Sequence, residues 1–446
     1  MLVRTTTLAL VLLTAAVGRA DDWPNWMGPK HDNVWRETGL IEKFPEGGPK
    51  VLWRTPVGGG YAGPAVSKGK VYVTDYVSKD LTEEQRVGGN FERKGSTGTE
   101  RVHCLDEATG KPVWKSPYEY PVKYAISYPA GPRCTPTVHD GKVYTLGAEG
   151  HLACLDAETG AKVWAKELKD EYKTKSALWG YASHPFIDGQ KLITLAGGDG
   201  SHVVAFDKNT GKEIWRSQSQ PEQDGQGYAP VTIIDAGGGR QLIVAGPKAL
   251  RSLDPETGKR NWSRPYDATN GATIMTPVVS GEYLYFGGYN HKNLLLKLKK
   301  NPADEPEVVW QDKKNAGVSP VNVQPFLQDG VLYGYDDSGD MYGVELPSGK
   351  RLWKGMGPVG GEQAKGSETA FIVKTGDRFV FFAETGHLVF GKLTPQGYEE
   401  IDRAKVIEQT GGAFGRKVVW SMPAFANKHA YIRNDKEIIC VDLAKP

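Results

Sequence analysis

The chain has 446 residues, of which 24% are charged and 55 are glycine, and its formal net charge is +2. Glycine is therefore about 12% of the residues against a usual level of roughly 7%, but it does not recur at every third position. With 39% hydrophobic residues and this pattern, the collagen-like and disordered classes are excluded.

The first twenty residues predict a secretory signal peptide. Residues 1–4 are a short basic start, residues 8–17 are almost wholly apolar, and residues 18–20 place small side chains before Asp21. The apolar stretch is about half of the roughly 20 residues that a membrane helix needs, so no membrane span is expected. We therefore expect a secreted protein located in the periplasm.

Removal of residues 1–20 changes the charge balance. It deletes Arg4 and Arg19 and no acidic residue, which leaves 53 basic residues against 53 acidic ones. A nucleic-acid-binding protein normally carries a clear basic excess, so no nucleic acid is expected as a partner. No cysteine lies near the cleavage site, so no lipid anchor is expected either.

Residues 21–50 are interpreted as an N-terminal extension. The short apolar sequence VLW follows it at residues 51–53. The first strand led by a proline comes next, at Pro64, and the second comes at Pro136, which is 72 residues later. Later prolines of this kind lie about 48 residues apart. The surplus falls at about residues 77–100, a charged and glycine-rich insertion that we expect to form a mobile flap.

A repeat governs the rest of the chain. The pattern DxxTGxxxW starts at Asp106, Asp156, Asp207 and Asp254, and a weaker form starts at Glu345. A second series, a proline followed by an apolar strand, gives eight units if the threonine of ETAF is included; its positions are Pro64, Pro136, Pro185, Pro230, Pro277, Pro325, Thr369 and Pro423. A period near 48 residues is typical of the blades of a β-propeller.

Each unit is expected to contain four short strands. In the second unit these are residues 135–138, 142–147, 151–156 and 162–164. The aspartate of DxxTG can accept hydrogen bonds from its own turn, and the glycine can adopt the positive φ that closes the hairpin. The tryptophan then lies on the outermost strand, where it can fill the space between neighbouring sheets.

The last unit predicts how the ring closes. The chain ends just after VDL at 441–443, so this unit lacks a fourth strand, and Trp53 in the sequence VLW is expected to complete it. The predicted fold is therefore all-β: an eight-bladed β-propeller of four-stranded antiparallel blades over residues 51–446, closed by pairing of its N- and C-terminal strands. Such pairing removes an exposed sheet edge.

Loops that enter the innermost strands of a propeller can form a binding site at its mouth. Aromatic walls with a few polar groups suit a small molecule or a sugar, although a narrow water-filled axis would show the same residues. The residues at this mouth are Tyr61, Arg133, Trp179, Tyr181, His184, Tyr228, Asn270, Asn322, Gln324, Glu368 and Trp420.

Each polar candidate has a structural alternative. Arg133 can pair with a carboxylate or can brace neighbouring loops through backbone carbonyls. His184 can act as a ligand or base, or can be a satisfied histidine at the start of a strand. Glu368 and Asn322 can supply oxygen ligands to Ca²⁺, although they form no motif. The acidic sequence DDSGD at 336–340 lacks the EF-hand spacing, and a hairpin turn is the favoured interpretation.

The repeated DxxTGxxxW motif, with the proline-led strands, resembles the repeat of the pyrroloquinoline quinone (PQQ) type β-propellers over about residues 51–446. This group includes the quinoprotein alcohol dehydrogenases and BamB, a non-catalytic lipoprotein of outer-membrane β-barrel assembly. Residues 22–40, 58–66 and 128–138 also look like parts of secreted bacterial PQQ-like propellers, as in planctomycetes. The resemblance is specific for the fold and much less so for the activity.

The cysteines depart from the enzyme pattern. Quinoprotein alcohol dehydrogenases usually carry two adjacent cysteines over the cofactor, whereas Cys104, Cys134, Cys154 and Cys440 are all isolated, and no CxxCH haem motif occurs. The lipid-anchor cysteine of BamB is missing as well. Three of these cysteines occupy one repeat position that accepts small residues, so buried free thiols are expected.

The sequence therefore favours a binding or scaffolding module, with a protein partner or a small-molecule or sugar ligand on the face that bears residues 77–100. A monomer is expected, and no cofactor or metal site is assigned. The alternative is a PQQ- and Ca²⁺-dependent quinoprotein alcohol dehydrogenase, or one of the polyvinyl alcohol type, in which a carboxylate at the mouth takes a proton while the quinone accepts hydride. No catalytic residue is assigned.

Overall fold

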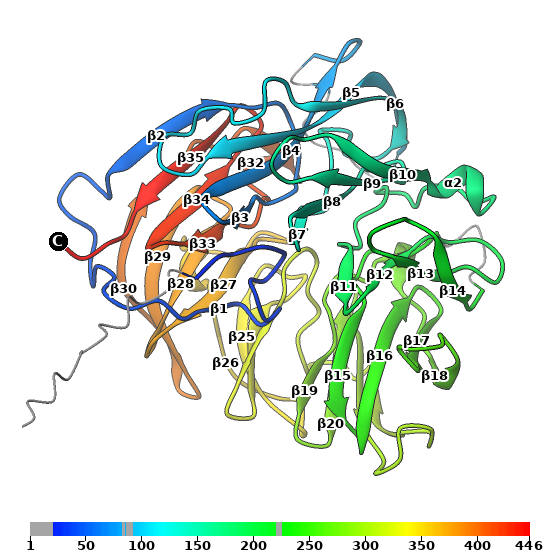
Figure 1. Ribbon diagram of the computed structural model, residues 1–446. Helices are drawn as coiled ribbons and strands as arrows, with labels where there is room; N and C mark the ends of the chain where they lie inside the picture. Colours follow the sequence, from blue (N-terminus) through cyan, green and yellow to red (C-terminus); the bar gives the residue numbers. More distant parts are fainter. Residues whose placement is uncertain (1–20, 83–84, 86–91, 220–224) are drawn as a thin grey trace, which may run out of the picture.

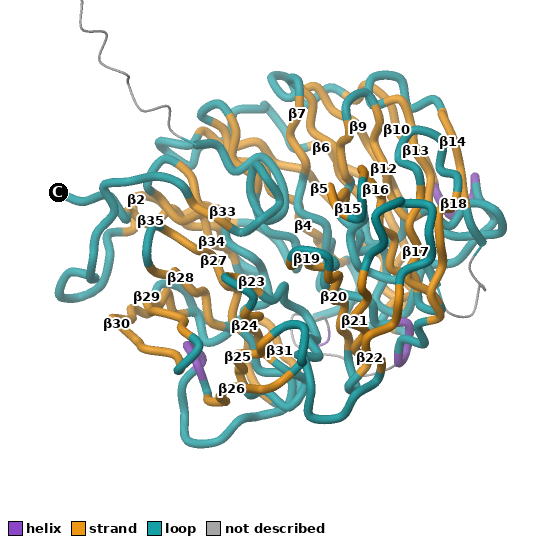
Figure 2. The backbone as a smooth tube through the Cα atoms, turned by 90° about the horizontal axis from the view of Figure 1, so that it is seen from below, coloured by secondary structure: helices purple, strands orange, loops and turns teal. Residues whose placement is uncertain are grey.

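The computed structural model describes residues 21–82, 85, 92–219 and 225–446. Within this part of the chain the molecule is almost wholly β-structure, and Figure 2 shows helices only as short segments between strands. The sheets comprise seven of four strands and one of five, together with a two-stranded hairpin. This all-β arrangement of antiparallel four-stranded sheets is consistent with a β-propeller. The predicted signal peptide, residues 1–20, lies outside the described residues.

The first four sheets follow one another along the chain. Sheet 1 consists of β3 (Ala65–Ser67), β4 (Lys70–Ser78), β5 (Lys94–Asp106) and β6 (Tyr118–Ile126). Sheet 2 consists of β7 (Thr137–His139), β8 (Lys142–Leu146), β9 (His151–Asp156) and β10 (Lys162–Glu167). Sheet 3 consists of β11 (Phe186–Asp188), β12 (Lys191–Leu195), β13 (Val203–Asp207) and β14 (Glu213–Ser217). Sheet 4 consists of β15 (Thr232–Ala236), β16 (Gly239–Gly246), β17 (Ala249–Leu253) and β18 (Arg260–Pro265).

The other four sheets continue the series. Sheet 5 consists of β19 (Val278–Ser280), β20 (Tyr283–Gly288), β21 (Lys292–Lys297) and β22 (Glu307–Gln311). Sheet 6 consists of β23 (Phe326–Gln328), β24 (Val331–Tyr335), β25 (Met341–Glu345) and β26 (Lys350–Gly355). Sheet 7 consists of β27 (Ala370–Thr375), β28 (Arg378–Ala383), β29 (His387–Thr394) and β30 (Gly397–Lys405), with β1 (Val34–Trp35) beside β27. Sheet 8 consists of β33 (Ala424–Ala426), β34 (His429–Arg433), β35 (Glu437–Asp442) and β2 (Val51–Pro56).

Short helical segments and one hairpin lie between the sheets in the described part of the chain. They are α2 (Leu168–Glu171), η2 (Thr269–Gly271), η3 (Gly357–Val359) and the hairpin of β31 (Gly411–Ala413) and β32 (Arg416–Val418). None of the helices in the described part of the chain is long and apolar enough to cross a membrane.

Sheet 8 combines strands from the two ends of the chain. β2 pairs antiparallel with β35, and Trp53 lies opposite Cys440 in this pairing. Figure 1 shows the two strands side by side, β2 in blue and β35 in red. The outermost strand of this sheet is therefore supplied by the residues that follow the N-terminal extension.

The repeated turns have the predicted geometry. In the first DxxTG turn, the Asp106 carboxylate accepts hydrogen bonds from the backbone N–H and the hydroxyl of Thr109, at 2.9 and 2.6 Å. Gly110 has a φ of +68°, and a Cβ placed there would lie 2.5 Å from the Trp53 ring. Glycine is required at this position because both the backbone conformation and the ring next to it exclude a side chain.

The tryptophans of the fourth strands connect neighbouring sheets. The Trp53 indole N–H donates to the carbonyl of Glu107 in sheet 1, at 2.8 Å, and that of Trp164 donates to the carbonyl of Lys208 in sheet 3, at 3.0 Å. Trp310 does the same with Pro347 of sheet 6, at 2.9 Å. Each ring thus packs on the turn of the following sheet, as the repeat predicts, and buries apolar surface between two sheets.

The cysteines are buried free thiols, as predicted. Cys104, Cys154 and Cys440 lie on the third strands of sheets 1, 2 and 8, each opposite a tyrosine of the second strand. Burial raises the pKa of the Cys154 thiol to about 12. These thiols therefore stay protonated near neutral pH and fill a narrow position in the core.

Candidate functional site

All of the predicted mouth residues lie in the segments that lead from the fourth strand of one sheet to the first strand of the next. We call these segments the connections, and the surface that they form the connection face. The described residues of the connections used below are 57–64, 127–136, 172–185, 218–219, 225–231, 312–325, 356–369 and 406–423.

Arg133 braces its own connection. Its guanidinium donates to the carbonyls of Ser127 and Tyr128, at 2.8 and 2.6 Å, and to the carbonyl of Gly131. The guanidinium also lies 5.1 Å from the centre of the Tyr61 ring, which belongs to the preceding connection. Two roles were predicted for Arg133: pairing with a carboxylate or bracing loops through backbone carbonyls. Its contacts within the chain are those expected for bracing.

The Arg133 contacts fix Tyr128 in an unusual conformation. Tyr128 has a φ of +52°, which is uncommon for a bulky aromatic residue. Its ring centre lies 6.3 Å from that of Trp420. Phe414, in the loop of the hairpin β31–β32, has its ring centre 6.2 Å from that of Trp420. We call Tyr128, Trp420 and Phe414 the aromatic shelf. Of these three residues, only Trp420 was among the predicted mouth residues.

A buried ion pair supports the aromatic shelf. The Glu384 carboxylate accepts hydrogen bonds from the Trp420 indole N–H at 2.8 Å and from the Arg416 Nε at 2.6 Å. Arg416 also donates to the carbonyl of Gly366, at 3.0 Å, in the connection before sheet 7. Burial raises the pKa of Glu384, while Arg416 and Trp420 act in the opposite direction. The pair therefore fixes the indole without leaving a net charge beneath it.

Trp179 and Tyr228 form a second aromatic pair. Their ring centres lie 5.3 Å apart, and the Trp179 backbone N–H donates to the Tyr228 hydroxyl at 3.3 Å. Burial raises the pKa of Tyr228 to about 12, and the positive charges of Arg93 and Arg133 oppose this increase. Tyr228 is therefore a neutral phenol held between two connections.

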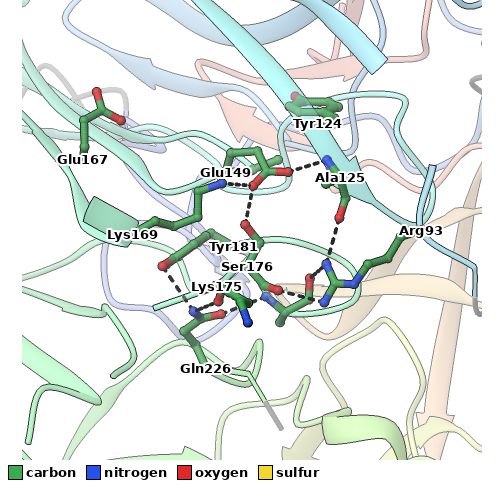
Figure 3. A network of polar contacts seen from close by, with 12 residues as sticks. Arg93, Tyr124, Ala125, Glu149, Glu167, Lys169, Lys175, Ser176, Tyr181 and Gln226 are labelled. Carbon is green, nitrogen blue, oxygen red and sulfur yellow. Dashed lines mark hydrogen bonds and ion pairs between the residues drawn. The ribbon is translucent and has the colours of Figure 1, made fainter. Parts of the chain in front are cut away.

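A polar network joins the connection at 172–185 to sheet 1 (Figure 3). The Glu149 carboxylate accepts hydrogen bonds from Lys169, Ser176 and the Ala125 backbone N–H, the last at 2.7 Å. Arg93 donates to the carbonyls of Ala125 and Ser176, at 2.8 and 2.9 Å. Buried groups that are satisfied in this way make the connection rigid.

Tyr181 belongs to the edge of the same network. Its hydroxyl donates to the carbonyl of Ala196 at 2.9 Å and accepts a hydrogen bond from Gln226 at 3.2 Å. The Gln226 side chain also accepts from the Ala177 backbone N–H, at 3.0 Å. Tyr181 is buried, so it holds two connections together instead of facing a ligand.

His184 and Gln324 occupy equivalent places, each directly before the proline of a first strand. Nδ1 of His184 accepts a hydrogen bond from the Thr135 backbone N–H at 2.9 Å, and Oε1 of Gln324 accepts one from the Thr276 N–H at 2.8 Å. Burial lowers the pKa of His184 to about 3, and the nearby His31 acts in the same direction. His184 is therefore a neutral acceptor that links sheets 2 and 3.

Asn322 and Glu368 lie in separate connections. Glu368 is buried, and its carboxylate accepts a hydrogen bond from the Lys365 backbone N–H at 2.8 Å. Both polar atoms of the Asn322 side chain are buried and have no hydrogen-bond partner among the described residues. No contact between these two side chains supports the predicted pair of calcium ligands.

The sequence DDSGD forms a hairpin turn between β24 and β25, as predicted. Asp336 is ion-paired with Arg351 and accepts a hydrogen bond from the Ser319 backbone N–H at 2.7 Å. Among the described residues, ligand atoms of His291, Asp336 and Asp337 lie within 4.8 Å of one another. Arg351 already neutralises the buried carboxylate of Asp336. We therefore interpret the three residues as a structural brace for the neighbouring connections and not as a metal site.

The N-terminal extension supplies a feature that the sequence did not predict. Residues 22–35, which we call the strap, run across the first strands of several sheets. Trp23 exchanges two backbone hydrogen bonds of 2.9 Å with Val66 of β3, and the Pro24 carbonyl accepts one of 2.7 Å from Val138 of β7. The strap then reaches sheet 7, where β1 pairs with β27 in parallel.

The strap covers the far end of the first strand at sheet 1, and at sheet 3 its Trp26 reaches His184 of a connection. Asp22 accepts a hydrogen bond from the Ser67 hydroxyl, at 2.9 Å, where β3 turns into β4. Trp26 stacks on His184 at 4.7 Å, and His31 lies 5.0 Å from Phe186 of β11. A cavity of about 20 Å³ remains between this part of the strap and the first strands of sheets 2 to 5, which is room for about one water molecule.

The insertion after β4 is in part regular sheet. Residues 94–100, predicted to belong to a mobile flap, extend β5, and Ser78 lies opposite Gly98 in its pairing with β4. β6 pairs with the same extension, so sheet 1 is longer than its neighbours. Alternating buried and less buried residues over 94–100 explain why this part is a strand. Residues 83–84 and 86–91 of the predicted flap lie outside the described residues.

Comparison with known proteins identifies relatives of two kinds. The family described as outer membrane protein assembly factor BamB (PQQ_2) matches residues 98–355. BamB of Shewanella oneidensis is 25% identical over 324 residues, which are 68% of this chain and 70% of that protein. The quinoprotein ethanol dehydrogenase of Pseudomonas aeruginosa is 27% identical over 222 residues, 46% of this chain and 34% of that enzyme. A second ethanol dehydrogenase and a 1-butanol dehydrogenase (quinone) are matched over 29% and 50% of their lengths.

Solved structures show the same fold. BamB from Moraxella catarrhalis superposes with a TM-score of 0.51 and 19% identity, over 83% of this chain and 97% of that one. The quinohemoprotein alcohol dehydrogenase from Comamonas testosteroni gives a TM-score of 0.58 and 13% identity, over 95% of this chain and 81% of that one. At these identities the likeness concerns the fold alone.

The residues of the connection face do not fit a quinone and its calcium ion. An anionic quinone needs cationic donors, but Arg93 and Arg133 each donate to three backbone carbonyls, and Arg416 is paired with Glu384. Ca²⁺ needs six or more oxygen ligands, and the Glu368 carboxylate already accepts a backbone N–H. These three arginines and Glu368 are thus engaged within the protein, and Asn322 alone offers too few oxygen ligands for Ca²⁺.

Proposed function

Because the chain belongs to the family described as outer membrane protein assembly factor BamB, we propose that it is a binding or scaffolding module. Its ligand or partner binds on the connection face. The single observation that carries the proposal is the contrast between the two ends of the first strands. At one end the strap covers the strands, whereas at the other the connections present aromatic rings whose supporting polar groups are already hydrogen-bonded.

A rigid surface of this kind suits binding. The rings at the connection face are held by buried hydrogen bonds and one buried ion pair, so a ligand has little ordering cost to overcome. The BamB relatives are named as assembly factors, which is in keeping with a partner-binding role. The proposal includes a protein partner and a small-molecule or sugar ligand as the two classes of occupant.

The proposal also includes the architecture and location. We infer that the eight sheets over residues 51–446 form one closed ring of blades, latched by the pairing of β2 with β35, and that residues 21–50 are its N-terminal extension. Residues 1–20 would direct the protein out of the cytoplasm, to the periplasm. A monomer is the proposed state.

Footprinting tests the proposed face. The protein is treated with hydroxyl radicals in the cells that produce it and again after purification, and the modification of Phe414, Trp420 and Tyr128 is compared with that of Trp310. We expect the three shelf residues to be protected in cells and to become reactive on purification, while Trp310, on β22, is equally reactive in both samples. Equal modification of the shelf in both samples would contradict the proposal.

The dehydrogenase alternative predicts a different outcome. Purified protein is incubated with PQQ and Ca²⁺, and the reduction of a dye is followed with ethanol, 1-butanol and polyvinyl alcohol as substrates. We expect no reduction above that of a sample without protein, because Arg93, Arg133 and Arg416 are already engaged within the protein. Alcohol-dependent turnover would replace the binding role by an enzymatic one.

A further inference from the structure

The hairpin β31–β32 displays an aromatic ring at an unfavourable backbone position. Ala413 pairs with Arg416, so the loop between the strands is Phe414 and Gly415, and their φ angles are +48° and +76°. A two-residue loop with both φ angles positive is a type I′ turn, which favours asparagine, aspartate or glycine at its first position. Phe414 is also 55% exposed, so burial of the ring does not offset the cost of this conformation.

A second aromatic residue shows the same conformation beside the same indole. Tyr128 has a φ of +52°, and its carbonyl accepts a hydrogen bond from Arg133 at 2.6 Å. Trp420 contacts both Tyr128 and Phe414, at 6.3 and 6.2 Å between ring centres. Strained residues of this kind gather at binding sites, where the surrounding structure holds them in place.

The ion pair beneath Trp420 and Phe414 carries little net charge. Arg416 lies 5.7 Å from the centre of the Phe414 ring and forms an ion pair with Glu384 at 2.6 Å. The guanidinium is thereby neutralised, which makes the shelf a poor match for a phosphate, a nucleic acid or an acidic sugar. An uncharged ligand that combines apolar faces with hydroxyl groups fits this chemistry better.

The area of the shelf also limits the class of ligand. A stable protein interface buries about 800 Å² on each partner. The shelf consists of three rings, and among them only Phe414 belongs to the large hydrophobic side chains that are exposed in the described residues. A short chain of sugar rings, which stacks its C–H faces on aromatic rings, needs much less surface than a protein.

We propose that the aromatic shelf of Tyr128, Trp420 and Phe414 binds an uncharged oligosaccharide, with its sugar rings stacked on the aromatic faces. This inference rests on the proposed binding function and names the ligand class for that face. Tyr128, Trp420 and Phe414 supply the faces, while Arg133 and Glu384 act as positioning residues that hold Tyr128 and Trp420 in place.

Titration with defined sugars tests the inference. Purified protein is titrated with neutral hexasaccharides of glucose, mannose, galactose, xylose and N-acetylglucosamine, and binding is followed by calorimetry and by tryptophan fluorescence. At least one of them should bind at millimolar concentration or below, and a hexasaccharide of galacturonic acid should not. Lack of binding by all five neutral sugars, or equal binding of the acidic one, would overturn the inference.

The variant Phe414→Asn separates binding from folding. Asparagine is favoured at this turn position, so the melting temperature should stay the same or rise, while loss of the ring should weaken binding about tenfold. Ile214→Thr, at an exposed residue of β14, is the matched control and should bind as the unaltered protein does. Unchanged binding by Phe414→Asn would overturn the inference.

The two proposals fail in different ways. Shelf protection in cells, together with no binding to any neutral sugar, would refute the oligosaccharide and retain the binding module, with a protein as the occupant. Equal modification of the shelf in cells and after purification would refute the binding module itself.

Discussion

The two ends of the first strands differ in how their aromatic residues are used. On the strap side, Trp23 and Trp35 are almost completely buried and contact Phe425 of β33, at 5.8 and 5.1 Å between ring centres. On the connection face, Trp420 is only half-buried and Phe414 is exposed. Trp23 and Trp35 thus provide core packing at one end, whereas Trp420 and Phe414 provide an accessible surface at the other. This difference is the physical basis for placing a binding site at the connection face.

The strap side should carry the larger part of the stability. Trp35→Ala removes an indole that is 1% exposed, and we expect a loss of about 4 kcal/mol in the free energy of unfolding. Urea unfolding followed by circular dichroism measures this loss. Leu52→Ala, at a residue exposed on β2, should cost less than about 0.5 kcal/mol. A loss below about 1 kcal/mol for Trp35→Ala would mean that the strap is not part of the core.

The ion pair beneath the aromatic shelf should have a smaller effect. Glu384→Gln leaves the charge of Arg416 uncompensated in a largely buried place, and we expect a loss of about 3 kcal/mol. Urea unfolding gives the stability, and the emission of Trp420 should shift because its indole loses a charged acceptor. Glu256→Gln, which removes an exposed carboxylate paired with Lys191, is the control with an expected loss below about 0.5 kcal/mol. Equal losses for both variants would contradict the assigned support role.

His184 lies between the two ends and should give a pH-dependent effect. Its folded-state pKa of about 3 is below the unfolded value of about 6.5, so the unfolded chain takes up a proton first as the pH falls. Stability is therefore fully present above pH 6.5 and is lost as the pH decreases toward 3. Between pH 7.5 and pH 5, His184 should account for a loss of about 2 kcal/mol.

His184→Gln should remove this part of the pH dependence. Glutamine occupies the equivalent place in sheet 6, where Gln324 accepts the same kind of hydrogen bond from Thr276. The variant should therefore keep the stability at pH 7.5 and lose about 2 kcal/mol less than the unaltered protein at pH 5. His429→Gln, on β34, is the control and should leave the pH dependence in place. An unchanged pH dependence in His184→Gln would show that the histidine is protonated in the folded state.

The sequence predicted the repeated parts of the molecule well. The spacing of DxxTGxxxW placed the strands of sheet 2 within a few residues, and it placed Trp53 in the sheet that contains the last strand. These features depend on local turns and on a fixed period, so neighbouring residues encode them. The candidate mouth residues lie in the connections, because each precedes or lies near the start of a repeated first strand, while their role in binding stays a prediction.

The contacts that give the site its form were not predictable from the period. The strap has no repeat of its own, and its route across β3, β7 and β27 depends on three separate sheets. Tyr128 and Trp420 come into contact from distant parts of the chain, and Phe414 sits in a hairpin outside the repeat. Gly415, directly after Phe414, was the one local signal that a tight turn displays this ring.

The pairing of β2 with β35 has a consequence for biosynthesis. Val51 pairs with Val441, and β1 pairs with β27, so β1 and β2 acquire these strand partners only after residues far along the chain have been made. Contacts between such distant residues slow folding because a long loop has to close. A nascent polypeptide that still lacks β35 has no strand on which β2 can dock.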